Sequence, residues 1–128
     1  MIRKAFIMSV HAGYEQEYKK RHNPIWKELE EEIHRHGGRK YSIFLDRITK
    51  TLFAYIEIED EQLWKKIDET PVCKRWHAYM KEIMPSNPDD TPVSRDLEEV
   101  FHIDWGRPTK KIDKWRKQKE RSTELRWC

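Results

Sequence analysis

The chain has 128 residues, of which 37% are hydrophobic and 38% charged, and its formal net charge is +3. This length suits one domain with a modest core, and an aromatic content of 12% argues against a disordered chain. Residues 106–128 hold nine Lys or Arg against three Asp or Glu, whereas residues 1–105 hold 17 against 20. We therefore expect a mildly acidic domain over 1–105, with no reason for nucleic-acid binding, and a basic extension over 106–128.

The N-terminus and the cysteines bear on the compartment. Residues 1–10 become polar too early for a signal peptide, and no apolar run approaches the length of a membrane span. Cys73 and Cys128 show neither a CxxC nor a Cys/His ligand spacing, so we expect no disulfide framework and read Cys73 as a small buried hydrophobe. These features predict a soluble cytoplasmic protein.

The first third of the chain predicts a strand followed by an interrupted helix. Residues 4–10 alternate in polarity and are rich in branched and aromatic side chains, which is typical of a strand. From Tyr14 to Arg35, apolar and aromatic residues recur every three or four positions, as on one face of a helix. Pro24 lies inside this pattern and removes a backbone donor, so we expect a kink or break at His22–Asn23.

The remainder predicts two strands, two helices, a loop and a last strand. A short hairpin joins the two strands, and Thr70 and Pro71 have the residue types of a helix cap and a first helical position. In chain order the expected elements are strands 41–46 and 51–58, helices 59–68 and 71–83, a proline-rich loop over 84–92, and a strand over 97–105.

This order of elements is the βαββαβ order of an α+β, ferredoxin-like fold. Such a chain forms an antiparallel sheet of four strands with helices on one face. The other face needs a cover, and in so short a chain a second copy supplies it most simply, so we predict a homodimer. Residues 110–125 have the composition of a charged helix, which we expect to be an appendage to this domain.

His22 is the residue with the clearest chemical potential. It lies on the apolar stripe of the 14–35 pattern, where a titratable group is costly unless it is paired or functional. One interpretation is a core histidine satisfied by a carbonyl or a tyrosine hydroxyl. The other is proton transfer, because an ordinary imidazole pKa of about 6.5 suits general acid–base catalysis. Tyr18, one turn earlier on the same face, and the break at Pro24 favour a polar pocket there.

Three further residues are candidates for the same pocket. Tyr41 adds a hydroxyl from a strand, although packing alone also explains a tyrosine there. Trp76 and His77 are adjacent in a helix and point about 100° apart, so both reach one pocket only if it lies along the flank of the helix. The other histidines share no ligand spacing, and a metal site is not expected; they are His11, His34, His36 and His102.

Residues 2–105 resemble the L-rhamnose mutarotase family. The most specific matching segments are Arg21-His22-Asn23-Pro24 and Met84-Pro85-Ser86-Asn87-Pro88-Asp89, and weaker matches lie at 2–6, 17–18, 25–26, 28–29, 52–54, 72–73, 75–76 and 92–93. The resemblance implies a dimeric, ferredoxin-like α/β barrel and an isomerase that interconverts the α and β anomers of L-rhamnose. It also implies that the enzyme needs neither a metal nor a cofactor.

Residue by residue, the resemblance implies that His22 is the proton donor and that Tyr18, Tyr41 and Trp76 contact the sugar. His77 stands where the family commonly has a second tryptophan, so it would bond a sugar hydroxyl or add a titratable group instead of stacking. Ring opening needs one group to protonate the ring oxygen while another takes the proton of the anomeric hydroxyl. The sequence does not identify the group that takes this proton, and the candidates are Tyr18, Tyr41, a carboxylate and a water molecule.

Two other classes of function compete with this one. Small ferredoxin-like dimers include monooxygenases and haem-binding proteins, in which His22 or His77 would be a ligand. A non-catalytic interaction module, with the basic extension docked on an acidic partner, is the other alternative. Fold alone does not choose between the three. The segments around His22 and Asn87 favour the mutarotase.

Overall fold

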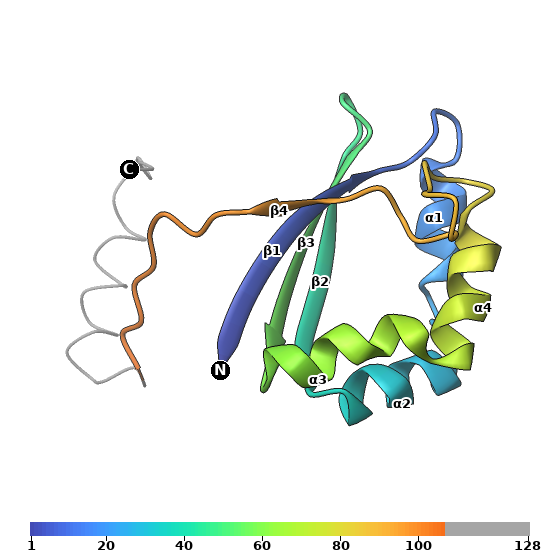
Figure 1. Ribbon diagram of the computed structural model, residues 1–128. Coiled ribbons are helices and arrows are strands. Elements are labelled where there is room, and N and C mark those ends of the chain that lie inside the picture. The colour runs from blue at the N-terminus through green and yellow to red at the C-terminus, as the bar shows by residue number, and fades with distance from the viewer. Residues whose placement is uncertain (107–128) are drawn as a thin grey trace, which may run out of the picture.

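The computed structural model describes residues 1–106, so the expected charged helix over 110–125 lies outside the described part. Four strands form one antiparallel sheet in the order β2-β3-β1-β4, and the helices cover one of its faces (Figure 1). The elements are β1 (Ile2–Ser9), α1 (Glu15–Arg21), α2 (Lys27–Arg35), β2 (Gly38–Asp46), β3 (Thr51–Ile58), α3 (Glu61–Lys65), the 3-10 helix η1 (Lys66–Glu69), α4 (Pro71–Met80) and β4 (Arg95–Leu97).

This arrangement confirms the α+β, ferredoxin-like prediction. Within the described residues the sheet is open, with β2 and β4 at its edges, and is not closed into a barrel. The described residues of one chain thus do not form the expected barrel. None of the helices among residues 1–106 has the length and apolar character needed to cross a bilayer.

The central strand β3 shows how the core is built. Leu52, Ala54, Ile56 and Ile58 are buried, whereas Phe53 between them is 43% exposed. Successive side chains of a strand point to opposite faces of the sheet, so this alternation separates the helix-covered face from the open one. The buried face packs with residues of α2 and α4 into one hydrophobic cluster.

The predicted helix break is confirmed. Helix α1 ends at Arg21 and α2 begins at Lys27, with a cis peptide bond between Asn23 and Pro24. The Lys19 carbonyl accepts both the backbone N–H of His22 (3.2 Å) and the side-chain amide of Asn23 (2.8 Å), which closes the C-terminal end of α1. The break places His22 at the C-cap of α1, directly after the last helical residue.

Several boundaries differ from the predictions, and local capping explains the start of α3. Asp60 accepts the backbone N–H of Leu63 (2.9 Å), so α3 begins at Glu61 and not at residue 59. It then tightens into η1 before Thr70, whose hydroxyl caps α4 as predicted. Helix α4 ends at Met80, three residues before the expected end.

The predicted last strand over 97–105 is wrong in extent. Strand β4 covers Arg95–Leu97 and pairs with β1 only from Ala5 to Ile7. Residues 98–105 form no strand within the described chain, and their apolar side chains are exposed; they include Val100, Phe101, Ile103 and Trp105. The alternating pattern that predicted a strand identifies side chains that favour burial, but it does not specify which surface buries them.

Replacing Gly38 by Ala is expected to destabilise the fold by about 1–3 kcal/mol, the usual cost of overpacking. A Cβ atom at Gly38 would lie 2.6 Å from Ile33 Cγ2, 2.9 Å from the Ile33 carbonyl oxygen and 3.1 Å from the Trp64 ring. The backbone contact cannot move without shifting α2 away from β2. Urea unfolding measures the loss, and an unchanged midpoint would contradict it.

Candidate active site

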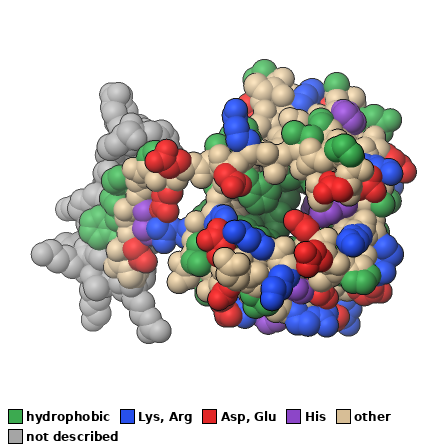
Figure 2. All heavy atoms as spheres, in the orientation of Figure 1, with side chains coloured by type: hydrophobic (Ala, Val, Ile, Leu, Met, Phe, Trp, Pro, Cys, Tyr) green, Lys and Arg blue, Asp and Glu red, His purple; other side chains and the backbone are tan. Residues whose placement is uncertain are grey.

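A cleft of about 1390 Å³ lies between the sheet and the helices. Figure 2 shows its mouth as a hollow with hydrophobic side chains at the bottom and charged side chains around the rim. Every site residue predicted from the sequence lines this cleft: Tyr18, His22, Tyr41, Trp76 and His77. Tertiary packing therefore brings α1, β2 and α4 together around one space.

His22 is held in a defined orientation. Its Nδ1 lies 2.8 Å from the Tyr18 carbonyl oxygen, and its ring stacks on the Tyr18 ring with centroids 4.4 Å apart. Because a carbonyl can only accept, Nδ1 carries the proton of this bond and Nε2 is the nitrogen that can exchange a proton. Burial lowers the pKa of His22, and the bond to the Tyr18 carbonyl opposes this shift.

Tyr18 and Tyr41 provide two protonated hydroxyls. Burial raises the pKa of Tyr18 far above its ordinary value, with a smaller contribution from Tyr41 nearby. Burial of the Tyr41 hydroxyl likewise raises its pKa, with smaller contributions from the nearby Cys73 and Asp68 side chains, although 40% of the residue's surface is exposed. Both phenols therefore stay protonated at neutral pH and can donate hydrogen bonds to a ligand.

Trp76 belongs to the core as well as to the cleft. It is 8% exposed and makes edge-to-face contacts with His22 and Trp26, with ring centroids 5.1 Å apart in each case. Its contact with His22 fixes the second side of the imidazole. The packing interpretation of Trp76 is therefore correct, and a sugar contact would use the small part of the ring that faces the cleft.

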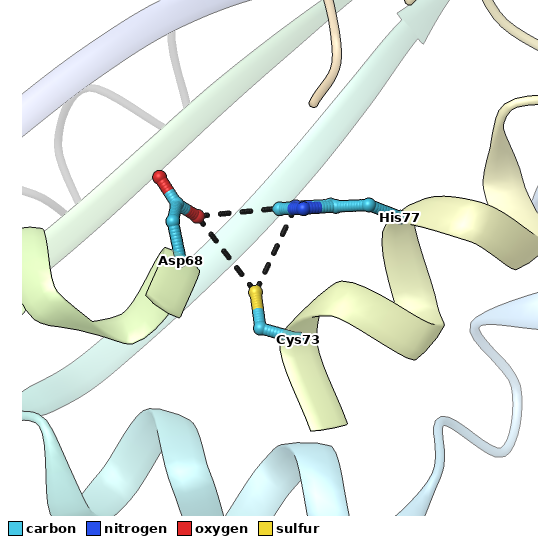
Figure 3. A group of neighbouring side chains, drawn as sticks. All are labelled: Asp68, Cys73 and His77. Atoms are coloured by element: carbon cyan, nitrogen blue, oxygen red, sulfur yellow. Dashed lines mark hydrogen bonds and ion pairs between the residues drawn. The ribbon is translucent and has the colours of Figure 1, made fainter. Parts of the chain in front are cut away.

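His77 is not a surface residue, because its side chain is only 11% exposed. Its Nε2 lies 3.7 Å from Cys73 Sγ and 3.9 Å from Asp68 Oδ1 (Figure 3). Burial lowers the pKa of His77, and the carboxylates of Asp68, Asp89 and Asp90 oppose this shift. Burial also raises the pKa of the Cys73 thiol to about 12, so this thiol is protonated and not an activated nucleophile.

The Asn87-Pro88-Asp89 segment has a structural role in the loop that contains it. The Asn87 amide donates to Thr91 Oγ1 (3.0 Å), and Asp89 accepts both the hydroxyl and the backbone N–H of Thr91. These bonds hold the loop beside His77, where Pro92 lines the cleft. The segment therefore shapes one wall of the site.

Three further residues shape the cleft, and the sequence did not predict this role for them. Arg21 donates to the Tyr79 carbonyl (2.5 Å) and lies over the Tyr79 ring, which ties α1 to α4. Asp68 and Cys73 also line the cleft. The spacing of four residues between Cys73 and His77 is the signal that could have identified this pair, since such residues share one face of a helix.

The site can move protons between a bound polar ligand and a buried imidazole. It combines one oriented histidine, two neutral phenols, aromatic walls and a carboxylate at the rim, which suits a small polyhydroxylated molecule better than a flat apolar one. The fold and site together define a ferredoxin-like α+β protein with an acid–base cleft.

Comparison with known proteins identifies the family. The profile of L-rhamnose mutarotase matches residues 3–103. The L-rhamnose mutarotase of Opitutus terrae is 59% identical over 104 residues, which are 81% of this chain and all of that protein. That of Escherichia coli K12 is 50% identical over 103 residues, 80% of this chain and 99% of the relative. The chain belongs to the L-rhamnose mutarotase family.

Solved structures agree with this assignment. The crystal structure of L-rhamnose mutarotase FA22100 from Formosa agariphila is 38% identical, has a TM-score of 0.75, and covers 81% of this chain and all of that one. A putative antibiotic biosynthesis monooxygenase from Nitrosomonas europaea has a TM-score of 0.55 at 13% identity, covering 79% and 100%. At that identity the second likeness shows the fold alone.

Proposed function

We propose that this chain interconverts the α and β anomers of L-rhamnose in the cleft, as an isomerase, with His22 as the proton donor to the ring oxygen. The observation that carries the proposal is the bond from His22 Nδ1 to the Tyr18 carbonyl. It leaves Nε2 as the exchangeable nitrogen, in a cleft that also contains two neutral phenols. Membership of the L-rhamnose mutarotase family supports the choice of sugar.

The geometry of mutarotation favours a fixed donor at the ring oxygen. Opening the ring breaks the C1–O5 bond, so O5 gains a proton while the anomeric hydroxyl loses one. Before closure on the other face, the carbonyl group rotates and its oxygen moves, whereas O5 receives and returns its proton at one place. A histidine locked between the Tyr18 and Trp76 rings suits the stationary atom.

Tyr18 and Tyr41 are proposed as hydrogen-bond donors to sugar hydroxyls, and His77 and the exposed edge of Trp76 as further contacts. Among the described residues, the hydroxyls of the two tyrosines make no hydrogen bond to protein, so a ligand can use them. The partner that takes the anomeric proton is proposed to be Asp68 or a water that it orients, since this carboxylate lines the same cleft. None of these roles uses a cofactor.

Lowering the pH from 8 towards 6 is expected to accelerate enzyme-dependent anomer exchange. The acid must hold its proton before the ring opens. As the pH falls, the protonated fraction of the acid rises by about tenfold per pH unit, as long as the pH is above its pKa. Because burial lowers the pKa of His22, the rise should continue below the ordinary imidazole value of about 6.5. Saturation-transfer NMR on L-rhamnose measures exchange after subtraction of the buffer rate. A rate that falls on acidification would make neutral imidazole the active form.

The chain is also proposed to act as a homodimer. The open face of the sheet presents Phe44 and Phe53, and residues 98–105 present a further exposed apolar set that includes Phe101. In Figure 1 this segment leaves β4 on the side of the sheet away from the helices. Exposed apolar surface of this kind is typical of an interface, and a second copy that covers both regions would complete the expected barrel.

In analytical ultracentrifugation, the full chain is expected to sediment at twice its mass of 15.8 kDa. Phe44→Asp and Phe101→Asp should each shift it towards the monomer, because a charge would be buried in the interface. Ile48→Asp is the control, since Ile48 lies in the β2–β3 turn and is 92% exposed. A monomeric wild type would contradict the proposal.

The cytoplasm is the proposed compartment. The buried free thiol of Cys73 is compatible with a reducing environment, where free cysteines persist. The acidic balance of residues 1–105 supports a small-molecule substrate in preference to nucleic acid.

A further inference from the structure

Three side chains with different donor atoms converge on one wall of the cleft. Asp68 comes from η1, and Cys73 and His77 come from successive turns of α4 (Figure 3). Sγ of Cys73 lies 3.7 Å from Asp68 Oδ1 and 3.7 Å from His77 Nε2, and these last two atoms lie 3.9 Å apart. The three atoms thus form a nearly equilateral triangle.

This triangle matches the spacing of ligands around a tetrahedral metal ion. Zinc binds sulfur at about 2.3 Å and imidazole nitrogen or carboxylate oxygen at about 2.0–2.2 Å, so tetrahedral ligand atoms lie about 3.3–3.6 Å apart. The observed distances exceed this by a few tenths of an ångström. The 3.9 Å between His77 Nε2 and Asp68 Oδ1 is too long for a hydrogen bond, and the two groups are linked directly only through the weak donor Cys73 Sγ, which lies 3.7 Å from each.

The surroundings suit a cation with one open coordination position. All three side chains line the cleft, so a fourth ligand can approach from that side. Asp89 and Asp90 add negative charge near His77, which offsets the cost of placing a divalent ion there. A Lys81–Asp90 ion pair (3.3 Å) neutralises part of this charge, and Asp68 and Asp89 remain as acidic groups.

The geometry does not fit a nucleophilic Cys-His-Asp arrangement. In such a relay the thiol and the carboxylate contact different nitrogens of the imidazole. Here Cys73 Sγ and Asp68 Oδ1 both approach Nε2 of His77. One nitrogen cannot bond both groups in a relay, whereas all three atoms can face one metal ion.

We propose that Asp68, Cys73 and His77 form a zinc-type site for a divalent cation, with Oδ1, Sγ and Nε2 as ligands and a fourth position open to the cleft. On binding, the thiol proton passes to solvent and the thiolate binds the metal. This site goes beyond the proposed mutarotation, and a metal ion bound to Asp68 Oδ1 would displace the proton transfer proposed for that carboxylate. A bound ion would bring a water or a sugar hydroxyl into the cleft that contains His22.

Cobalt titration of the full chain tests the site. The protein is first freed of metal with a chelator and kept in a non-thiol reductant. One equivalent of Co²⁺ is expected to produce tetrahedral d–d absorption and a thiolate-to-cobalt charge-transfer band, and Zn²⁺ should abolish both by displacement. A wild-type protein that shows no saturable one-equivalent binding would overturn the proposal whatever the variants do.

Matched variants assign the ligands. Cys73→Ser is expected to remove the charge-transfer band, whereas Cys128→Ser should keep it, because Cys73 supplies the sulfur of the cluster found among the described residues. His77→Ala and Asp68→Asn should each raise the dissociation constant more than about tenfold, since even outer-sphere partners contribute that much. A band that survives Cys73→Ser, or an affinity that neither His77→Ala nor Asp68→Asn changes, would overturn the assignment. Anomer exchange is measured separately, so its loss or survival is independent of this result.

Discussion

Replacing His22 by Asn is expected to lower enzyme-dependent anomer exchange of L-rhamnose by about 10²- to 10⁴-fold, the usual contribution of a general acid. The Asn side chain is polar and can donate to the Tyr18 carbonyl as Nδ1 does, but it cannot supply a proton to the ring oxygen. The loss should therefore appear in kcat, with a small change in KM. Saturation-transfer NMR measures the exchange directly.

His36 offers a matched control for His22. It occupies the same position at the end of α2, and its Nδ1 lies 3.0 Å from the carbonyl oxygen four residues earlier, that of Glu32. It does not line the cleft. His36→Asn should therefore leave anomer exchange unchanged, although it alters the equivalent bond to the Glu32 carbonyl in α2. Wild-type exchange in His22→Asn would show that His22 is not the acid.

Trp76→Ala is expected to destabilise the fold by about 3–5 kcal/mol, the usual cost of removing a large buried aromatic side chain. Its ring contacts His22, Trp26 and Tyr79, so its removal leaves a cavity between α1 and α4 and frees the imidazole. A domain of this size has only about 5–15 kcal/mol of stability, so the variant should unfold at much lower urea. Its exchange rate should fall as well, because His22 loses its support.

Two comparisons make this result specific. Trp76→Phe keeps an aromatic ring beside His22 and should lose less stability than Trp76→Ala. Ile48→Ala removes a side chain that is 92% exposed and should change stability by no more than about 0.5 kcal/mol. If Trp76→Ala unfolds at the same urea concentration as Ile48→Ala, the packing role assigned to Trp76 is wrong.

Local patterns predicted the elements well because they depend on neighbouring residues. The alternation over 51–58, the apolar stripe from 14 to 35 and the Thr70-Pro71 start of α4 all record backbone periodicity or capping. The break after His22 follows from one proline, because a proline lacks the backbone N–H that a helix needs regardless of the surrounding fold. The element order then sufficed to predict the ferredoxin-like sheet.

Predictions about contacts between distant residues were less complete. Residues 97–105 have the pattern of a strand, but only three residues of β4 find a partner on β1. Asp68 and Cys73 lie on different elements, and no local rule shows that their side chains meet. Trp76 was a candidate for both packing and sugar contact, and the rings around it place it mainly in the core.

By itself, the sequence determined the family, the order of elements and the position of His22 at an interrupted helix, because residue types, spacing and one proline encode these directly. Only the tertiary structure decided that the end of α1, strand β2 and helix α4 bring their candidate side chains to one cleft. This convergence depends on the packing of α1 and α4 against one sheet. Distances between residues remote in sequence are set by that packing, not by any local pattern.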